Sequence, residues 1–400
     1  MPERSTDVTT DAEHGPTTAL ISILAVATGA LIANLYYAQP LIASIGPDIG
    51  INSDLAGAIV SVTQIGYGIG LFLLVSLADL VENRRLVLIT LTLTTVGLVA
   101  TALSTSAVPF FMASFLVGFC STGAQVLLPF VAYLVPEVRR GRVLGNVMAC
   151  VLTGIMLARP VALFIAASFG WRAVFGSSAV LMLVIGLLLI RMMPRHAPRG
   201  GMHYGWILLS MIELFRTMPV LRWQSAIQAL MFGAFNMFWT AAPLMLADRF
   251  GMTQRHIALF ALAGAGGALA APIAGRLADR GLGRTANISA VVALGLAFYG
   301  TRWATAAGLV AVLVLLAILI DAAVQTTQII SRRLIFAVPS DRRGRVNAIY
   351  MTCLFGGGAI GSILGSLTYH WGGWSATATA GGLIGVLALA LMTLRVRVAT

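Results

Sequence analysis

The chain contains no lysine, and charged residues make up only 10% of its 400 residues. Soluble domains carry about 25% charged residues, so this scarcity argues against an ordinary soluble protein. Hydrophobic residues make up 58% of the chain, which excludes a disordered protein, because disorder requires few apolar residues and much charge. The apolar residues form blocks of about 20 residues, the length with which an α-helix crosses a bilayer. The composition therefore predicts a polytopic membrane protein.

Arginine alone supplies the cationic charge, and the formal net charge is +12. The arginines form short clusters between apolar blocks instead of one patch, which indicates membrane orientation and not a nucleic-acid surface. The three cysteines lie in apolar blocks without C-x-x-C spacing, as expected for buried small hydrophobic residues. The chain also has no Walker motif and no H-E-x-x-H or G-x-S-x-G motif. We therefore expect no cofactor, no metal site, no nucleic-acid partner and no enzymatic activity.

Twelve apolar blocks predict an all-α polytopic fold with twelve transmembrane helices in two six-helix bundles. The blocks cover residues 17–43, 55–78, 86–106, 108–135, 143–168, 172–193, 222–247, 256–278, 285–303, 305–331, 346–369 and 374–394. The predicted divisions are a disordered cytosolic tail (1–16), an N-terminal bundle (17–193), a cytosolic linker (194–221) and a C-terminal bundle (222–396). Apolar and charged residues alternate around Tyr204–Arg216, which predicts an interfacial amphipathic helix in the linker.

The arginines are distributed unequally between the two sides of the predicted membrane. If the N-terminus is cytosolic, only Arg172, Arg249, Arg255 and Arg302 fall in outer loops, and Arg159 lies within a span. The other 21 of the 26 arginines then face the cytosol. Because positive residues are retained on the cytoplasmic side, both termini are expected in the cytosol of a cell that carries the protein in its inner or plasma membrane.

The two halves of the chain repeat each other. Leu77-Ala78-Asp79 recurs 200 residues later as Leu277-Ala278-Asp279, and the loop 136–143 recurs 203 residues later at 339–346. Gly170-Trp171 recurs as Gly373-Trp374 at the same offset of 203 residues. Landmarks that recur in the same order at nearly one offset indicate a duplication, with one bundle from each copy.

The strongest motif runs from Gly275 to Arg284 and is similar to the Gly-x-x-x-Asp-Arg-x-Gly-Arg loop of the major facilitator superfamily, with one extra residue. The segment 75–85 is a degenerate first-half copy. On these motifs the chain resembles that superfamily over essentially its whole length. The resemblance implies two parallel six-helix halves and transport by alternating access. It also implies a functional monomer in the bilayer that binds a small molecule.

Within the superfamily, the chain is most similar to bacterial drug and sugar exporters coupled to protons. Gly145 and Gly154 have the spacing of the antiporter pattern on the fifth span, whereas Ala158-Arg159-Pro160 replaces its Gly-Pro step. The resemblance implies proton-driven export of small organic solutes. A metabolite importer or facilitator of the same superfamily remains the alternative, and a membrane sensor that transports nothing is a third possibility.

Only Asp321 and Arg159 place ionisable groups deep within predicted spans. Such groups are costly in a bilayer and are functional candidates by default. A buried carboxylate that binds and releases a proton next to an arginine would couple protonation to transport if the pair opened and closed between conformations. The alternatives are a fixed structural ion pair and an Arg159 side chain that extends to the membrane surface.

Uncharged polar and aromatic residues on the spans that the resemblance assigns to the cavity are candidate substrate contacts. Amides donate and accept hydrogen bonds, and aromatic faces suit apolar or cationic solutes. Interhelical hydrogen bonding favours the same residue types and remains the alternative for each. The candidates are Asn34, Tyr37, Gln125, Asn236, Trp239, Gln325 and Gln328.

The repeated loops combine a carboxylate with arginines at a predicted helix end. They are candidate cytosolic gates that close when the protein faces outward. A charge cluster that only orients the protein would explain the arginines but not the repeated aspartate. The gate residues are Asp79, Arg84, Arg85, Asp279, Arg280 and Arg284.

Overall fold

The computed structural model describes residues 18–78, 80–194, 203–267 and 270–398, and these residues form helices and short connections without a strand. The predicted tail (1–16) and Asp79 lie outside the described residues. Helices of the first half are α1 (Thr18–Ala33), η1 (Gln39–Leu41), α2 (Ile42–Asp48), η2 (Ser53–Leu55), α3 (Ala58–Leu77), α4 (Asn83–Leu103), α5 (Ala107–Ser121), α6 (Gly123–Leu134), α7 (Glu137–Phe169) and α8 (Trp171–Met192).

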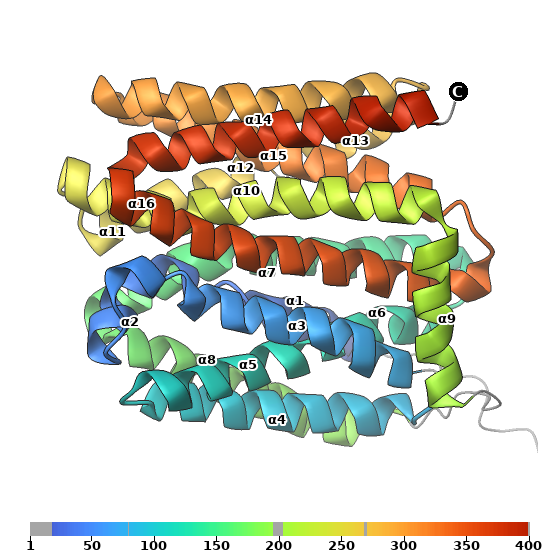
Figure 1. Ribbon diagram of the computed structural model, residues 1–400. Coiled ribbons are helices and arrows are strands. Elements are labelled where there is room, and N and C mark those ends of the chain that lie inside the picture. The colour runs from blue at the N-terminus through green and yellow to red at the C-terminus, as the bar shows by residue number, and fades with distance from the viewer. Residues whose placement is uncertain (1–17, 79, 195–202, 268–269, 399–400) are drawn as a thin grey trace, which may run out of the picture.

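A linking helix and the second half follow. They are α9 (Tyr204–Thr217), α10 (Pro219–Phe250), α11 (Gln254–Ala261), α12 (Ala263–Gly267), α13 (Ala270–Asp279), α14 (Gly283–Ala306), α15 (Val310–Ile335) and α16 (Ser340–Val398). In Figure 1 the first half (blue to green) and the second half (yellow to red) lie beside each other with their long helices side by side. The short helix α9 crosses one end of both.

Twelve crossings account for these helices, as the sequence predicts. Eight helical stretches in the described residues are long and apolar enough to span a membrane, and the last of them, Arg342–Leu394, covers 53 residues. That stretch crosses twice, because Gly372 and Gly373 interrupt its helical geometry. The helix α1 with η1, the pieces α11–α13 and the helix α14 supply the other three crossings.

The duplication is visible in the backbone at two glycines 203 residues apart. Gly170, with φ +80°, separates α7 from α8, and Gly373, with φ +59°, lies at the bend of α16. Positive φ values strain residues that carry a Cβ atom. The repeated Gly-Trp pair of the sequence therefore marks the same reversal in each half.

The helices α10 and α16 pack against each other through glycine. A Cβ atom on Gly357 would collide with the backbone of Ala229, and one on Gly361 would collide with the backbone of Gly233. Small residues spaced four apart allow two helices to approach this closely in a membrane. Tight packing therefore explains these two glycines of the second half.

The helix α9 bonds to both halves. The Tyr204 hydroxyl donates to the carbonyl of Leu73 at 3.0 Å, and Arg345 donates to the Ser210 hydroxyl at 2.7 Å. Ile207 on α9 is buried, whereas Trp206 is exposed. This amphipathic pattern agrees with the predicted interfacial helix, and the boundaries of the linker and bundles stay a prediction.

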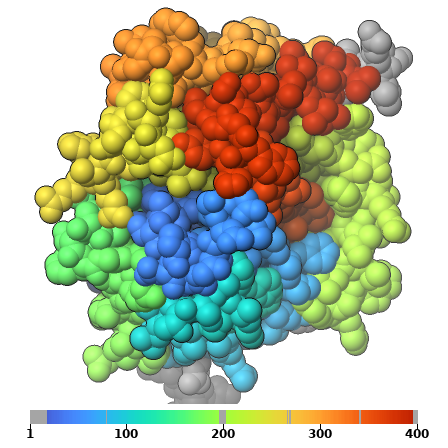
Figure 2. Space-filling model, turned by 60° about the vertical axis from the view of Figure 1, so that its left-hand side comes forward, coloured from blue at the N-terminus to red at the C-terminus, as the bar shows by residue number. Residues whose placement is uncertain are grey.

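The end of the molecule opposite α9 is closed. Figure 2 brings this end forward, and the blue and red segments meet there without a visible opening. The Gly57 amide donates to the Ser366 hydroxyl at 3.0 Å, and the Ser61 hydroxyl donates to the carbonyl of Ala359 at 2.7 Å. These bonds join α3 of the first half to α16 of the second. We call this end the closed end.

Candidate functional site

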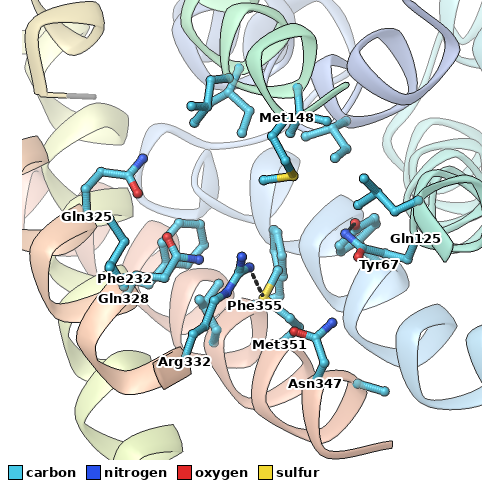
Figure 3. A pocket seen from close by; sticks show the side chains of 18 of the residues that line it. Tyr67, Gln125, Met148, Phe232, Gln325, Gln328, Arg332, Asn347, Met351 and Phe355 are labelled. Carbon is cyan, nitrogen blue, oxygen red and sulfur yellow. Dashed lines mark hydrogen bonds between the residues drawn. The ribbon is translucent and has the colours of Figure 1, made fainter. Parts of the chain in front are cut away.

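A cavity of about 690 Å³ lies between the two halves. Its inner end is formed by Arg159 and Asp321, and its lining extends to Ala78 and Arg343 at the α9 end. Figure 3 shows side chains from both halves around this space. A cavity that reaches one end, together with closure at the other, is the arrangement expected of a transporter open to one side.

At the inner end, Trp239 lies between the two buried ionisable residues. The indole Nε1 of Trp239 (α10) donates to Asp321 Oδ1 (α15) at 2.9 Å. The guanidinium carbon of Arg159 (α7) lies 4.7 Å from the centre of the Trp239 ring. No ion pair within 4.0 Å joins Asp321 to Arg159 among the described residues. The two charges therefore interact through the indole and not by direct contact in this conformation.

Arg159 is held by aromatic rings and an amide. Its Nε donates to Gln39 Oε1 at 2.9 Å, and its guanidinium lies 5.1 Å from the ring centres of both Tyr36 and Phe235. Aromatic faces attract cations, which explains how this arginine is accommodated. With only 3% of its surface exposed, Arg159 does not extend to the membrane surface, which removes one of the alternatives.

Glycines on α12 make room for Asp321. A Cβ atom on Gly264 would lie 2.9 Å from Asp321 Oδ2, and a Cβ atom on Gly267 would collide with the Asp321 side chain. Gly264 itself lines the cavity. The glycine-rich eighth span therefore lets the carboxylate lie at the cavity wall while 5% of the residue remains exposed.

Three of the predicted contact residues, Gln125, Gln325 and Gln328, line the cavity. Gln125 donates to the Tyr67 hydroxyl at 3.1 Å, which fixes its amide at the wall of the first half. Their role as substrate contacts stays a prediction.

The other four predicted contacts do not line the cavity. Asn34 accepts a hydrogen bond from Ser178 at 2.6 Å within the first half, and Tyr37 is buried near the same serine. Asn236 Oδ1 accepts hydrogen bonds from Gln64 and Gln39, so it joins the two halves between the cavity and the closed end. Trp239 lies between Arg159 and Asp321, to which it donates. Their role as substrate contacts stays a prediction, and interhelical hydrogen bonding remains the alternative.

Several lining residues have no counterpart in the prediction. They include a set of aromatic residues and two polar groups near the α9 end: Tyr36, Tyr67, Phe232, Phe235, Phe355, Arg332 and Asn347. Arg332 and Asn347 follow or begin apolar blocks, and hydropathy alone assigned Arg332 to a cytosolic segment. Arg332 follows Gln325 by seven residues, which places both on the same face of a helix. This spacing is the feature of the sequence that indicates Arg332 as a lining residue.

The predicted gate residues lie at the α9 end and bond within their own halves. Asp279 forms an ion pair with Arg333, and Arg84 donates to the carbonyl of Ile190. Arg85 lies in the first turn of α4, Arg280 follows the end of α13, and Arg284 lies in the first turn of α14. Asp79 lies outside the described residues. Their role in gating stays a prediction.

A second charged cluster lies near the closed end, outside the spans. Asp48 Oδ2 accepts from the Trp171 indole at 2.9 Å and from Arg172 at 2.7 Å. These two hydrogen bonds, the first from Trp171, hold the pKa of the Asp48 carboxyl below its ordinary value. The cluster ties α2 to the start of α8.

The model of the Major Facilitator Superfamily matches residues 24–336 and 225–400 of the chain. The chain belongs to the Major Facilitator Superfamily. It is 35% identical over 381 residues to the uncharacterized transporter YgaY of Escherichia coli O157:H7, with 95% of this chain and 96% of the relative covered. It is also 32% identical to the probable transporter SCO4007 of Streptomyces coelicolor, over 90% of this chain and 84% of the relative.

Solved structures share the fold of this superfamily member at low identity. A D-xylose–proton symporter superposes with a TM-score of 0.74 at 18% identity, covering 94% of this chain and 97% of that one. The nucleoside transporter NupG superposes with a TM-score of 0.72 at 16% identity, covering 94% and 99%. The superfamily and the all-α fold predicted from the sequence are thereby confirmed, and the protein is a membrane transporter.

Proposed function

We propose that the protein is a secondary active transporter that exports small organic solutes in exchange for protons. The observation that carries the proposal is Asp321, the one carboxylate among the described residues that line the cavity between the halves. A proton-coupled carrier requires a group that gains and loses a proton at the transport site. Arg159 does not meet this requirement, because a guanidinium is not deprotonated in proteins.

Protonation of Asp321 changes the electrostatics of the inner end of the cavity. The ionised carboxylate opposes the positive charge of Arg159 across Trp239, whereas the neutral acid leaves that charge unopposed. In a medium of low dielectric constant, interactions of this kind are strong and extend over several ångströms. Proton binding therefore alters which arrangement of α7, α10 and α15 has the lowest free energy, and this supports coupling.

The direction follows from the proposed orientation. The excess of arginine at the α9 end supports a cytosolic location for that end. The cavity then opens to the cytosol, and the conformation is the one in which an exporter loads its solute. In this conformation Asp279 and Arg84 bond only to residues of their own halves. We propose that the two loops meet each other when the cavity closes on this side.

Proteoliposomes with an imposed pH gradient test the proposal. A panel of aromatic drugs, organic acids and sugars is screened for solutes that stimulate proton flux by the purified protein. The substitution Asp321→Asn keeps the shape of the side chain and removes its titration. We expect it to abolish uphill transport of the solute found while leaving exchange of labelled for unlabelled solute intact.

The matched control is Asp48→Asn, which removes another carboxylate of the same protein that does not line the cavity. We expect this control to retain proton-driven transport. The proposal is wrong if Asp321→Asn still concentrates solute at the wild-type rate. Solute flux without any proton movement would instead identify a facilitator, and uptake in the direction of the proton would identify an importer.

A further inference from the structure

Arg332 brings a second cation into the cavity, closer to the α9 end. Figure 3 shows its side chain within the space, near Gln328, Met351 and Phe355. Its Nη2 donates to Met351 Sδ at 3.2 Å, and its buried Nε has no hydrogen-bond partner among the residues that the structure describes. A thioether is a weak acceptor, whereas a guanidinium has five N–H groups to donate. The hydrogen-bonding capacity of Arg332 is therefore poorly used within the protein.

In the part of the chain that the structure describes, no carboxylate forms an ion pair with Arg332, and none lies within 4.0 Å of its guanidinium. The described lining contains four arginines against one carboxylate, Asp321. Arg343 and Arg345 stand at the α9 end and already bond to Val338 and Ser210. A partly buried cation without a counter-charge is costly, and a bound anion would offset that cost.

Arg332 and Asp321 are the two ends of one polar face of α15. Asp321, Gln325, Gln328 and Arg332 follow at spacings of four, three and four residues, which places them on one side of a helix, and all four line the cavity. Eleven residues of helix correspond to about 16 Å. An anionic group at Arg332 is thus well separated from the proton site, and the two glutamines lie between them.

The walls around this face are aromatic. Phe355 lies between Tyr67 and Phe232, with ring centres 4.5 Å and 5.3 Å away. All three rings line the cavity, and Met351 adds a flexible apolar side chain beside Arg332. Aromatic walls bind flat apolar bodies, and glutamine side chains bind polar substituents. The Arg332 guanidinium therefore lies beside a largely apolar wall of the cavity.

From these features we infer that the cavity binds aromatic organic anions, with the anionic oxygens held by Arg332 and the ring system packed against the wall that Tyr67, Phe232 and Phe355 form. A planar guanidinium binds a carboxylate in a bidentate manner. The inference rests on the proposed function only in treating the bound compound as the transported solute. Binding itself requires no gradient and is measured separately.

Equilibrium dialysis with the full-length protein in nanodiscs tests the inference. The probes are aromatic carboxylates of increasing size, beginning with 2-naphthoate, each compared with its neutral amide and with the corresponding aryl-methylammonium ion. We expect at least one carboxylate to bind about tenfold or more tightly than its amide, and the ammonium ions to bind least. Equal binding of carboxylate and amide, preference for ammonium, or no binding by any carboxylate would overturn the inference.

Substitutions then assign the preference to Arg332. Arg332→Gln should bring the ratio of carboxylate to amide affinity close to one, and Arg332→Lys should retain part of it, because lysine keeps the charge but lacks the planar fork. The control Arg302→Gln removes the same charge from an exposed position outside the cavity and should preserve the ratio. A wild-type ratio in Arg332→Gln contradicts the inference. If Arg332→Gln does not fold, a wild-type affinity ratio in Arg332→Lys contradicts the inference instead.

The two proposals fail in distinguishable ways. Tight carboxylate binding by wild-type protein that moves neither solute nor protons in proteoliposomes would refute the transport proposal and leave the anion site standing. Proton flux stimulated by neutral or cationic solutes, with no carboxylate preference in dialysis, would refute the anion site and leave the transport proposal standing.

Discussion

Replacing Asn236 with leucine removes the side-chain acceptor that joins the two halves between the cavity and the closed end. Asn236 Oδ1 accepts from Gln64 Nε2 at 2.5 Å and from Gln39 Nε2 at 3.2 Å. Both glutamines belong to the first half, Asn236 belongs to the second, and all three are fully buried. Separation of the halves at the closed end would break these bonds. Asn236→Leu is therefore expected to destabilise this conformation relative to one that opens there.

The two glutamines contribute unequally to the expected effect. Gln39 Nε2 keeps two long contacts of 3.5 Å, with Thr240 Oγ1 and with the backbone carbonyl of residue 236, whereas Gln64 Nε2 has no second acceptor among the described residues and is left without a partner. An unpaired buried donor costs about 1–3 kcal/mol. A change of about 2 kcal/mol corresponds to a shift of roughly 30-fold in the equilibrium between the two conformations.

Labelling of a cysteine at the closed end measures this shift. Ser362 is fully buried on α16 and bonds to Thr240 within its own half, so Ser362→Cys reports opening without removing a bond between the halves. With the three native cysteines replaced by alanine, we expect Asn236→Leu to raise the rate of maleimide labelling by about tenfold or more.

Asn34→Leu is the matched control. It deletes a buried acceptor whose donor, Ser178, lies in the same half. We expect a lower melting temperature and an unchanged labelling rate. Equal labelling of Asn236→Leu and the parent protein would refute the reasoning, because the bond between the halves would then contribute nothing to closure.

Two further predictions concern pH and packing. Asp48→Asn should lower the melting temperature at neutral pH, because the depressed pKa of Asp48 means that folding favours its charged form. That stabilisation is present above the ordinary aspartate pKa of about 4 and is lost as the pH falls through the lower folded value, so a difference that persists in acid would contradict it. Gly357→Val should destabilise the fold by about 1–3 kcal/mol or more, because a Cβ atom there collides with the backbone of Ala229. The folded peak in size-exclusion chromatography should shrink accordingly. Gly141→Ala, with open space around it, should elute as wild type.

The helices and their duplication were accessible from the sequence because lipid imposes a uniform demand. Every crossing needs a run of apolar residues, and the reversals at Gly170 and Gly373 need a residue without a Cβ atom. Interruptions inside a crossing were not accessible. The first predicted span, 17–43, ends its long helix at Ala33, where the chain turns to place Gln39 beside Arg159.

The cavity was predictable in its residue types and less so in its positions. Gln125 and Gln328 repeat at one offset, and both line the space. Asn34 and Asn236 look equally suitable in sequence, yet one bonds inside the first half and the other bonds across the halves. The direction in which a polar residue faces depends on how neighbouring helices pack, which a single sequence does not contain. Arg332 was assigned outside the spans because hydropathy does not distinguish a water-filled cavity from a loop.

The bonds that Gly57 and Ser61 make to α16 at the closed end contain no charged group. Hydroxyl and backbone groups make them, the Ser53 hydroxyl also lies 3.2 Å from His370 Nδ1, and each of the three described ion pairs lies within one half. Water replaces neutral hydrogen bonds of this kind at little net cost. Dissolved salt weakens interactions between charges by screening, but it weakens neutral hydrogen bonds much less. Opening at that end should thus depend little on ionic strength. A change in the salt concentration of the medium at that end would therefore leave the balance between the two conformations nearly unchanged.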